Sequence, residues 1–253
     1  MLQRPSSDGA YDLRGAIGVQ AQAVNQVCFS HVELRTTAPA EAAAFYNDVL
    51  GPGPRSIVEL PSRARALGAP PHWLGTLGVA AERVDDDANA LISRGAQRLG
   101  PPGAGAKMIL RGPGGAIVAL GAEEATAPTG VVWHHLNAAG AARASASLAA
   151  ALGWSFGPVT EAAGAPAVQE FAWREGQTPV GSVADVAGRP GVHTHWMFFF
   201  GVRGLDDALA RARARGAVVI GPTWHAGARV AVCDDPQGAA FGLLELDVDA
   251  MAS

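Results

Sequence analysis

Two apolar stretches of closely similar sequence stand out in the hydropathy pattern of this chain. Residues 72–79 read HWLGTLGV and residues 195–202 read HWMFFFGV, so His, Trp, Gly and Val recur at the same spacing. A short, nearly unbroken apolar run that ends near a glycine is typical of a buried β-strand. We therefore predict two buried strands, the second of them within residues 191–202.

The similarity between the two stretches continues downstream. Further residues recur at an offset that changes only between 121 and 123: Arg94-Gly95-Ala96 with Arg215-Gly216-Ala217, Gly100-Pro101 with Gly221-Pro222, and Pro113, Gly115 and Ala116 with Pro236, Gly238 and Ala239. A repeat of about half the chain is too long for a solenoid unit. It predicts two structurally equivalent halves.

A second repeat precedes each of these stretches. Residues 27–36 predict a strand that places Phe29, His31 and Glu33 on one face. A helix should follow, because apolar residues recur there at helical spacing. The same strand and helix return without a gap at an offset of 102, over residues 131–153.

Each half also contains a second unit that begins with one of the two His-Trp strands. Residues 205–215 predict an amphipathic helix, with apolar side chains on one side and charged ones on the other. Three strands are expected to follow, around residues 218–220, 228–233 and 240–246. The order is therefore βαβββ, and residues 72–122 give the same order.

The unit at the start of the chain is shorter than its counterpart. Only 21 positions separate Gly51 from His72, whereas 42 separate Gly153 from His195. Because the elements on either side align, the missing length lies between the helix of the first unit and the start of the second unit. We expect the first unit to lack a pair of strands.

Composition and charge narrow the possible functions. Hydrophobic residues make up 49% and charged residues 17% of the chain, which is typical of a globular protein. No apolar run approaches the roughly 18 residues needed to span a bilayer, and the N-terminus lacks an apolar signal core, so a cytoplasmic protein without membrane contact is expected. The net charge of −4 gives no reason to expect nucleic acid as a partner. Cys28 and Cys233 are expected to be reduced, packed thiols.

Four such units in tandem, with the segments HVELRTTAPAEAAAFYNDVLG, GPGGAIVAL and DDPQGAAFGL at corresponding places, resemble the vicinal-oxygen-chelate superfamily. That group includes glyoxalases, bleomycin resistance proteins and extradiol dioxygenases. The resemblance implies an α+β fold in which tandem βαβββ units pair into two glyoxalase-like domains, each an open curled sheet with helices outside. It places an N-terminal lead-in at 1–25, a first domain with a shortened first unit at 26–122, and a second domain at 131–248.

The resemblance also implies where a divalent metal would bind. In the family, the ligands are typically a His on the first strand of a unit and a carboxylate on the last strand. His31 matches the first-strand position, but Trp133 stands at that place in the second domain. Ala119 and Gly242 stand where a last-strand carboxylate is expected, so no metal cofactor is favoured.

Two unusual ligand sets would still allow Zn, Fe, Mn or Ni, because imidazole and carboxylate both bind such ions. The first set is His31, Glu33 and His72, and the second is His135, His193 and His195. Each set depends on side chains two residues apart pointing the same way from a strand. The alternative is that these histidines are structural residues with hydrogen-bonded rings.

The function expected from these residues is the binding of a small organic ligand, such as an antibiotic or metabolite to be sequestered, in the second domain. The candidate ligand-binding residues are Trp133, His135, His193, His195, Met197 and Phe199. One alternative is a metal-dependent lyase, isomerase or dioxygenase that acts on a small oxygen-bearing substrate. A partner-binding scaffold is the third possibility, and the protein should be a monomer or homodimer.

Overall fold

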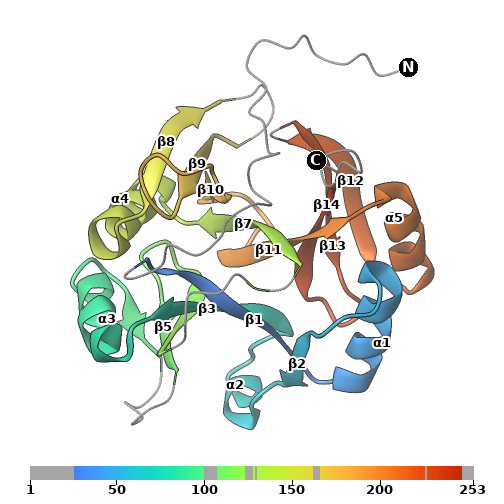
Figure 1. Cartoon of the computed structure of the whole chain (residues 1–253). Helices are drawn as coiled ribbons and strands as arrows, with labels where there is room; N and C mark the ends of the chain where they lie inside the picture. Colours follow the sequence, from blue (N-terminus) through green and yellow to red (C-terminus); the bar gives the residue numbers. More distant parts are fainter. Residues whose placement is uncertain are drawn as a thin grey trace.

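The computed structural model describes residues 26–99, 107–122, 128, 130–161, 166–225 and 227–246. Two mixed β-sheets form its centre, and helices lie around them (Figure 1). The predicted lead-in, residues 1–25, lies outside the described residues, as do Gly100 and Pro101. The helices are α1 (Pro39–Leu50), α2 (Ser62–Ala66), α3 (Val84–Ile92), α4 (Ala141–Leu152) and α5 (Leu205–Ala214), with the 3-10 helix η2 (Ala81–Arg83) before α3.

The first sheet has the strand order β2-β1-β3-β6-β5-β4, and the second has the order β12-β13-β14-β11-β7-β10-β9-β8. The strands of the first sheet are β1 (Cys28–Thr36), β2 (Ser56–Glu59), β3 (His72–Val79), β4 (Gln97–Arg98), β5 (Met108–Arg111) and β6 (Ile117–Ala122). Those of the second sheet are β7 (Val131–Ala138), β8 (Ser155–Thr160), β9 (Val168–Ala172), β10 (Gly181–Asp185), β11 (His195–Val202), β12 (Val218–His225), β13 (Ala228–Asp234) and β14 (Ala240–Glu245).

The repeat in the sequence reappears in the strand pairing. The two His-Trp strands, β3 and β11, each pair in parallel with the last strand of their unit. Thr76 lies opposite Ala119 in the first sheet, and Phe199 lies opposite Gly242 in the second. Both residues of the second pair stand 123 positions after those of the first. The predicted α+β architecture of two glyoxalase-like domains is thereby confirmed.

The two sheets differ in the segment that follows the helix of the first unit in each domain. In the second sheet, α4 is followed by β8, β9 and β10, and β10 pairs in parallel with β7. In the first sheet, α1 is followed by β2, which pairs in parallel with β1. β2 therefore takes the place of β10, and the first sheet as described has six strands where the second has eight.

Three details of the predicted strands were wrong. The pairing of β1 shifts between Phe29 and His31, so Phe29 turns into the core while His31 and Glu33 stay on the opposite face. Such a bulge breaks the regular alternation of a strand. The strand β11 begins at His195 because a turn precedes it, and His193 is exposed outside the strand. β12 continues past its predicted end to His225.

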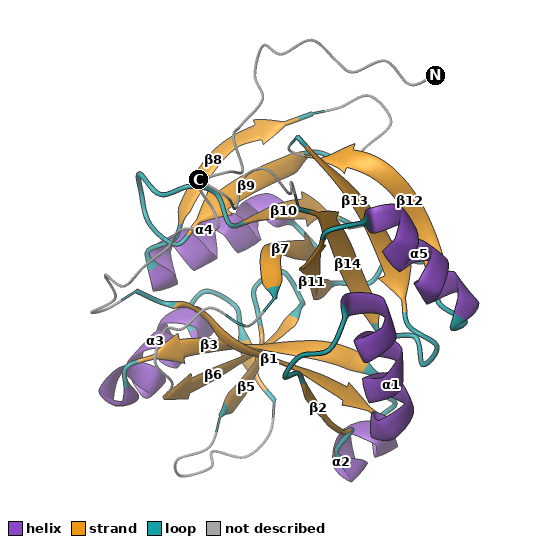
Figure 2. Cartoon of the chain, turned by 45° about the vertical axis from the view of Figure 1, so that its right-hand side comes forward, coloured by secondary structure: helices purple, strands orange, loops and turns teal. Residues whose placement is uncertain are grey.

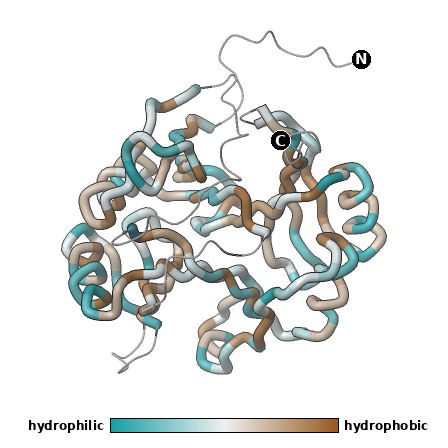
Figure 3. Tube along the Cα trace, in the orientation of Figure 1, coloured by the Kyte–Doolittle hydropathy of each residue, from teal (hydrophilic) through white to brown (hydrophobic). Residues whose placement is uncertain are grey.

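One hydrophobic core joins the two domains, because the sheets pack through the faces that carry the helices. α1 lies against α5 and α3 against α4, on opposite sides of the molecule in Figures 1 and 2. Along these helices hydrophilic and hydrophobic segments alternate (Figure 3), as expected of amphipathic helices. The rings of Trp73 and Phe200 meet at 5.1 Å where β3 and β11 approach each other. Gly75 allows this approach, since a Cβ there would overlap the rings of Phe29 and Phe198.

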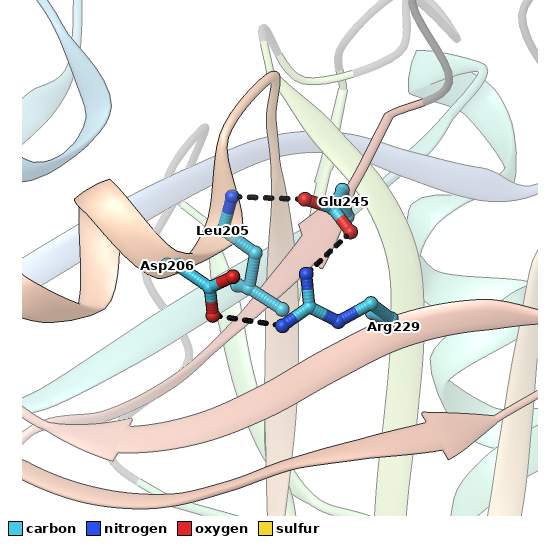
Figure 4. Close-up of polar contacts among 4 residues, drawn as sticks. All are labelled: Leu205, Asp206, Arg229 and Glu245. Carbon is cyan, nitrogen blue, oxygen red and sulfur yellow. Dashed lines mark hydrogen bonds and ion pairs between the residues drawn. The ribbon is translucent and has the colours of Figure 1, made fainter. Parts of the chain in front are cut away.

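Two polar networks join separate elements of the fold, one in the interior and one nearer the surface. Across the domain contact, Trp73 donates to the Tyr46 hydroxyl at 3.0 Å, which donates to Asp235 at 3.1 Å. In the second domain, Glu245 accepts the backbone N–H of Leu205 at the start of α5, and Arg229 binds both Glu245 and Asp206 (Figure 4). A carboxylate at a helix N-terminus stabilises it through the orphan N–H groups and the dipole.

The two cysteines are buried and are not joined by a disulfide. Burial raises the pKa of Cys28 to about 11 and that of Cys233 to about 12, so both remain protonated thiols at neutral pH. Among the described residues, no helix is long and apolar enough to cross a membrane.

Candidate functional site

One face of the second sheet is separate from the main core. It lies opposite the face covered by α4 and α5, and we call it the distal face. A small apolar cluster on it consists of Trp133, Met197, Phe199, Val230 and Leu244. Because side chains alternate along a strand, His135 and Asn137 of β7 and His195 of β11 share this face with the cluster.

A continuous row of hydrogen bonds crosses the distal face. The indole of Trp133 donates to the Ser182 hydroxyl of β10 at 3.1 Å. That hydroxyl lies 2.8 Å from Nδ1 of His135, and Nε2 of His135 lies 3.2 Å from Oδ1 of Asn137. Nδ2 of Asn137 lies 3.5 Å from Nε2 of His195, which closes the row with its longest contact.

The direction of each hydrogen bond follows from the His195 end. Nδ1 of His195 lies 2.8 Å from the backbone carbonyl of His193, so it carries the proton and donates. Burial lowers the pKa of His195, so its Nε2 is unprotonated and accepts from the Asn137 amide. The Asn137 oxygen then accepts from Nε2–H of His135, and the Ser182 hydroxyl holds the other ring nitrogen of His135. His195 is therefore neutral and in one fixed tautomer.

The first domain carries a row at the corresponding positions of its sheet, and this row is charged. His31, Glu33 and Arg35 stand 102 positions before Trp133, His135 and Asn137, and His72 stands 123 before His195. Arg35 binds Glu33 at 2.7 Å, and His31 lies 3.8 Å from the same carboxylate. His72 is opposite Arg35, and its Nδ1 donates to the Pro70 carbonyl at 2.8 Å. Burial lowers the pKa of His72, and the charge of Arg35 adds to this effect.

Comparison with protein-family models gives one match that spans most of the chain. Residues 29–243 match the model described as the Glyoxalase/Bleomycin resistance protein/Dioxygenase superfamily. The chain belongs to this superfamily. No curated protein sequence matches it.

Solved structures support the same fold. The 2,3-dioxygenase LapB from Pseudomonas sp. KL28 is 14% identical, with a TM-score of 0.59 over 88% of this chain and 94% of that one. The Mn(II)-bound glyoxalase from Novosphingobium aromaticivorans is 14% identical, with a TM-score of 0.54 over 88% and 82%. Homoprotocatechuate 2,3-dioxygenase from Arthrobacter globiformis is 16% identical, with a TM-score of 0.56 over 89% and 83%. At such identities the similarity concerns the fold alone.

The superfamily's usual metal position in the second domain does not fit a metal. The strand register brings Trp133, Phe199 and Gly242 opposite one another on β7, β11 and β14. None of these side chains is a metal ligand. A Cβ on Gly242 would overlap the ring of Phe199, so the ring fills the space into which a carboxylate would project. The site is occupied by packed aromatic side chains.

At the equivalent position of the first domain, the strand register places His31 opposite Thr76, and Thr76 opposite Ala119. Of these three side chains, His31 alone is a common metal ligand. The unusual ligand sets do not form metal sites either. Among the described residues, no three His, Cys, Asp or Glu side chains come close enough to hold a metal ion. Glu33 is engaged by Arg35, and His193 is exposed outside the strand, contributing its carbonyl rather than its ring to the row.

The structure places the other sequence-based candidates, Trp133, His135, His195, Met197 and Phe199, together on the distal face. Sequence reasoning missed Asn137 and Ser182. Asn137 stands two residues after His135, so strand alternation could have identified it. Ser182 lies in β10, whose position in the sheet no sequence repeat indicated.

Proposed function

We propose that the distal face of the second domain binds a small organic molecule without a metal ion, as a binding or sequestering protein does. The observation that carries this proposal is the hydrogen-bonded row from Trp133 to His195 beside the apolar cluster. Ligand sites combine a mostly apolar lining with a few precisely oriented polar groups. The row supplies such groups, because each of its members is held by its neighbours.

The arrangement favours a ligand with a flat apolar part and a hydrogen-bonding edge. The apolar part would pack on Trp133, Met197 and Phe199. The edge would reach the second N–H of the Asn137 amide or the remaining lone pair of Ser182. Since burial lowers the pKa of His195, that end of the row offers no positive charge to an anionic ligand.

The alternative of a metal-dependent lyase, isomerase or dioxygenase needs about three protein ligands around an open metal position. Both ring nitrogens of His135 and of His195 are already engaged by protein groups. A metal ion would have to displace those contacts, and Phe199 would have to leave Gly242. This donor set supports binding without metal.

A titration monitored by NMR tests the proposal. The probe is 2-naphthylmethanol, and the reporter is the indole N–H signal of Trp133, assigned by its loss in Trp133→Phe. We expect a saturable shift of this signal that is the same with and without EDTA. Binding that requires an added metal ion, or a shift confined to Trp73 of the first domain, would contradict the proposal.

A further inference from the structure

A small apolar cavity lies at the contact between the two domains, beside the packed helices α3 and α4. Its volume is about 20 Å³. The large side chains that line it come from both domains, and they are Leu77, Leu91, Val118, Leu136, Leu148 and Trp196. Leu136 and Trp196 belong to the main core, so the cavity and the distal face lie on opposite sides of the second sheet.

The repeat in the sequence explains why this space stays open. At the matching contact between α1 and α5, an aromatic cluster fills the space, and it consists of Phe45, Tyr46, Trp73 and Phe241. The residues at the corresponding repeat positions are Ser147, Leu148, Trp196 and Val118. All but the tryptophan are smaller than their counterparts. Smaller side chains leave a cavity where the surrounding structure does not close around them.

Trp73 and Trp196 occupy the same place in the repeat but differ in the partner of the indole N–H. In the first domain, Trp73 donates to the Tyr46 hydroxyl at 3.0 Å. In the second domain, Leu148 stands at the position of Tyr46 and offers no acceptor. Trp196 is 5% exposed, and no described residue accepts a hydrogen bond from its N–H. A donor that is removed from bulk water gains free energy when it meets an acceptor.

Water is a poor occupant of this cavity. A buried water molecule typically makes about three hydrogen bonds with polar groups that have no other partner. The carbonyls of Gly112, Pro113 and Gly114, in the turn that lines the cavity, already accept from other groups of the chain. The other lining side chains are apolar. A molecule with an apolar body and one acceptor for the N–H of Trp196 matches these surroundings better.

We propose that this cavity binds a small neutral molecule that is apolar except for one hydrogen-bond acceptor, and that the acceptor meets the indole N–H of Trp196. The apolar part would contact Leu91, Leu136 and Leu148. Since one water needs about 10–15 Å³ of such space, the cavity admits a molecule of about two or three non-hydrogen atoms. Ligands of this size bind with dissociation constants of about 1 mM at best. The site is independent of the ligand proposed for the distal face.

Acetonitrile and propyne are matched probes for this site. Both are linear and of similar length, but only acetonitrile ends in a hydrogen-bond acceptor. The reporter is the indole N–H NMR signal of Trp196, assigned by its loss in Trp196→Phe. We expect acetonitrile to shift this signal saturably and to bind at least about fivefold more tightly than propyne, which is the effect of one hydrogen bond. Equal affinities, or a shift that rises linearly without saturation, would overturn the proposal.

The variant Leu148→Tyr gives α4 the residue that α1 has at Tyr46. The larger ring should fill the cavity, and its hydroxyl should accept from Trp196, so acetonitrile should no longer shift the signal. Ala144→Val narrows the same cavity with a smaller change and should weaken acetonitrile binding at least about fivefold, which tests the site if Leu148→Tyr does not fold. The control Leu67→Tyr, at an exposed position after α2, should bind as the wild type does. Wild-type affinity in a folded Leu148→Tyr or Ala144→Val protein would show that the cavity is not the binding site.

Discussion

The aromatic ring of Phe199 lies directly over the backbone of Gly242, its partner on the neighbouring parallel strand. Glycine is required there because any side chain would enter the ring's space. The pair closes the position at which the superfamily typically presents a carboxylate. Phe199 is also part of the apolar cluster around Trp133. A glycine in place of a carboxylate at position 242 therefore makes room for an aromatic ring on the distal face.

Gly242→Ala should therefore displace Phe199 and disturb the distal face. We expect a loss of about 1–3 kcal/mol in the free energy of unfolding, measured by urea denaturation, because overpacked sites of this kind cost that much. Phe199→Ala should reduce the effect of the glycine substitution in a double-mutant cycle.

Gly157→Ala is the matched control for this experiment. It lies in β8 of the same sheet, and a Cβ there would meet its nearest neighbour, the Glu170 carbonyl, at an ordinary 3.8 Å. We expect it to change the free energy of unfolding by less than about 1 kcal/mol, within the cost of a well-tolerated substitution. Equal effects of the two substitutions would contradict the close contact of Phe199 with Gly242.

Much of the fold could be predicted because residue types recur where the backbone geometry is demanding. The His-Trp strand starts and glycine turns kept their spacing in both halves, and the structure repeats the pairing of β3 with β6 in that of β11 with β14. The turn of Phe29 into the core could not be predicted, because a bulge leaves no mark in alternation until pairing is known. The place of Ser182 in the hydrogen-bonded row was also inaccessible. It depends on β10, and no repeat in the sequence indicated where this strand lies in the sheet.

Acid should weaken the domain contact through His134. Its ring is buried, stacks on Phe29 of the first domain at 5.1 Å, and faces Trp173 and Phe198. Nδ1 lies 2.9 Å from the Val180 carbonyl, and Nε2 is buried without a partner among the described residues. Burial lowers the pKa of His134 to about 4, so the neutral ring is strongly preferred in the folded state.

The sign of the pH dependence follows from this shift. Below its ordinary pKa of about 6.5, the imidazole of the unfolded chain takes up a proton that the folded protein resists. Stability from His134 is therefore complete above about pH 6.5 and is lost as the pH falls to about 4, by up to about 3 kcal/mol in all. His134→Gln, which retains a donor for Val180, should flatten the difference in unfolding free energy measured across this range. Parallel profiles of the two proteins would contradict the prediction.

Metal ions should have little effect on stability. A ligand that binds only the folded state raises the unfolding midpoint with its concentration. Because Trp133, Phe199 and Gly242 offer no donor side chains, we expect the same midpoint in EDTA and in excess Zn, Fe, Mn or Ni. The purified protein should hold well under one equivalent of these metals by elemental analysis. A stoichiometric metal that is lost in His135→Ala would contradict this and favour the enzyme alternative.

Ser182→Ala should show what the hydrogen-bonded row does for binding. The Ser182 hydroxyl accepts from the Trp133 indole and lies 2.8 Å from Nδ1 of His135, so its removal takes one hydrogen-bond partner from each of these side chains. Losing such a partner costs about 1 kcal/mol, which is about fivefold in affinity for 2-naphthylmethanol. NMR of the ring nitrogens should show His135 protonated at Nε2 in both proteins, because the Asn137 oxygen still faces that nitrogen in Ser182→Ala. Ser147→Ala, at a buried serine of α4 on the far side of the sheet, should change neither the tautomer nor the affinity. An unchanged affinity of Ser182→Ala for 2-naphthylmethanol would show that the row does not contribute to binding on the distal face.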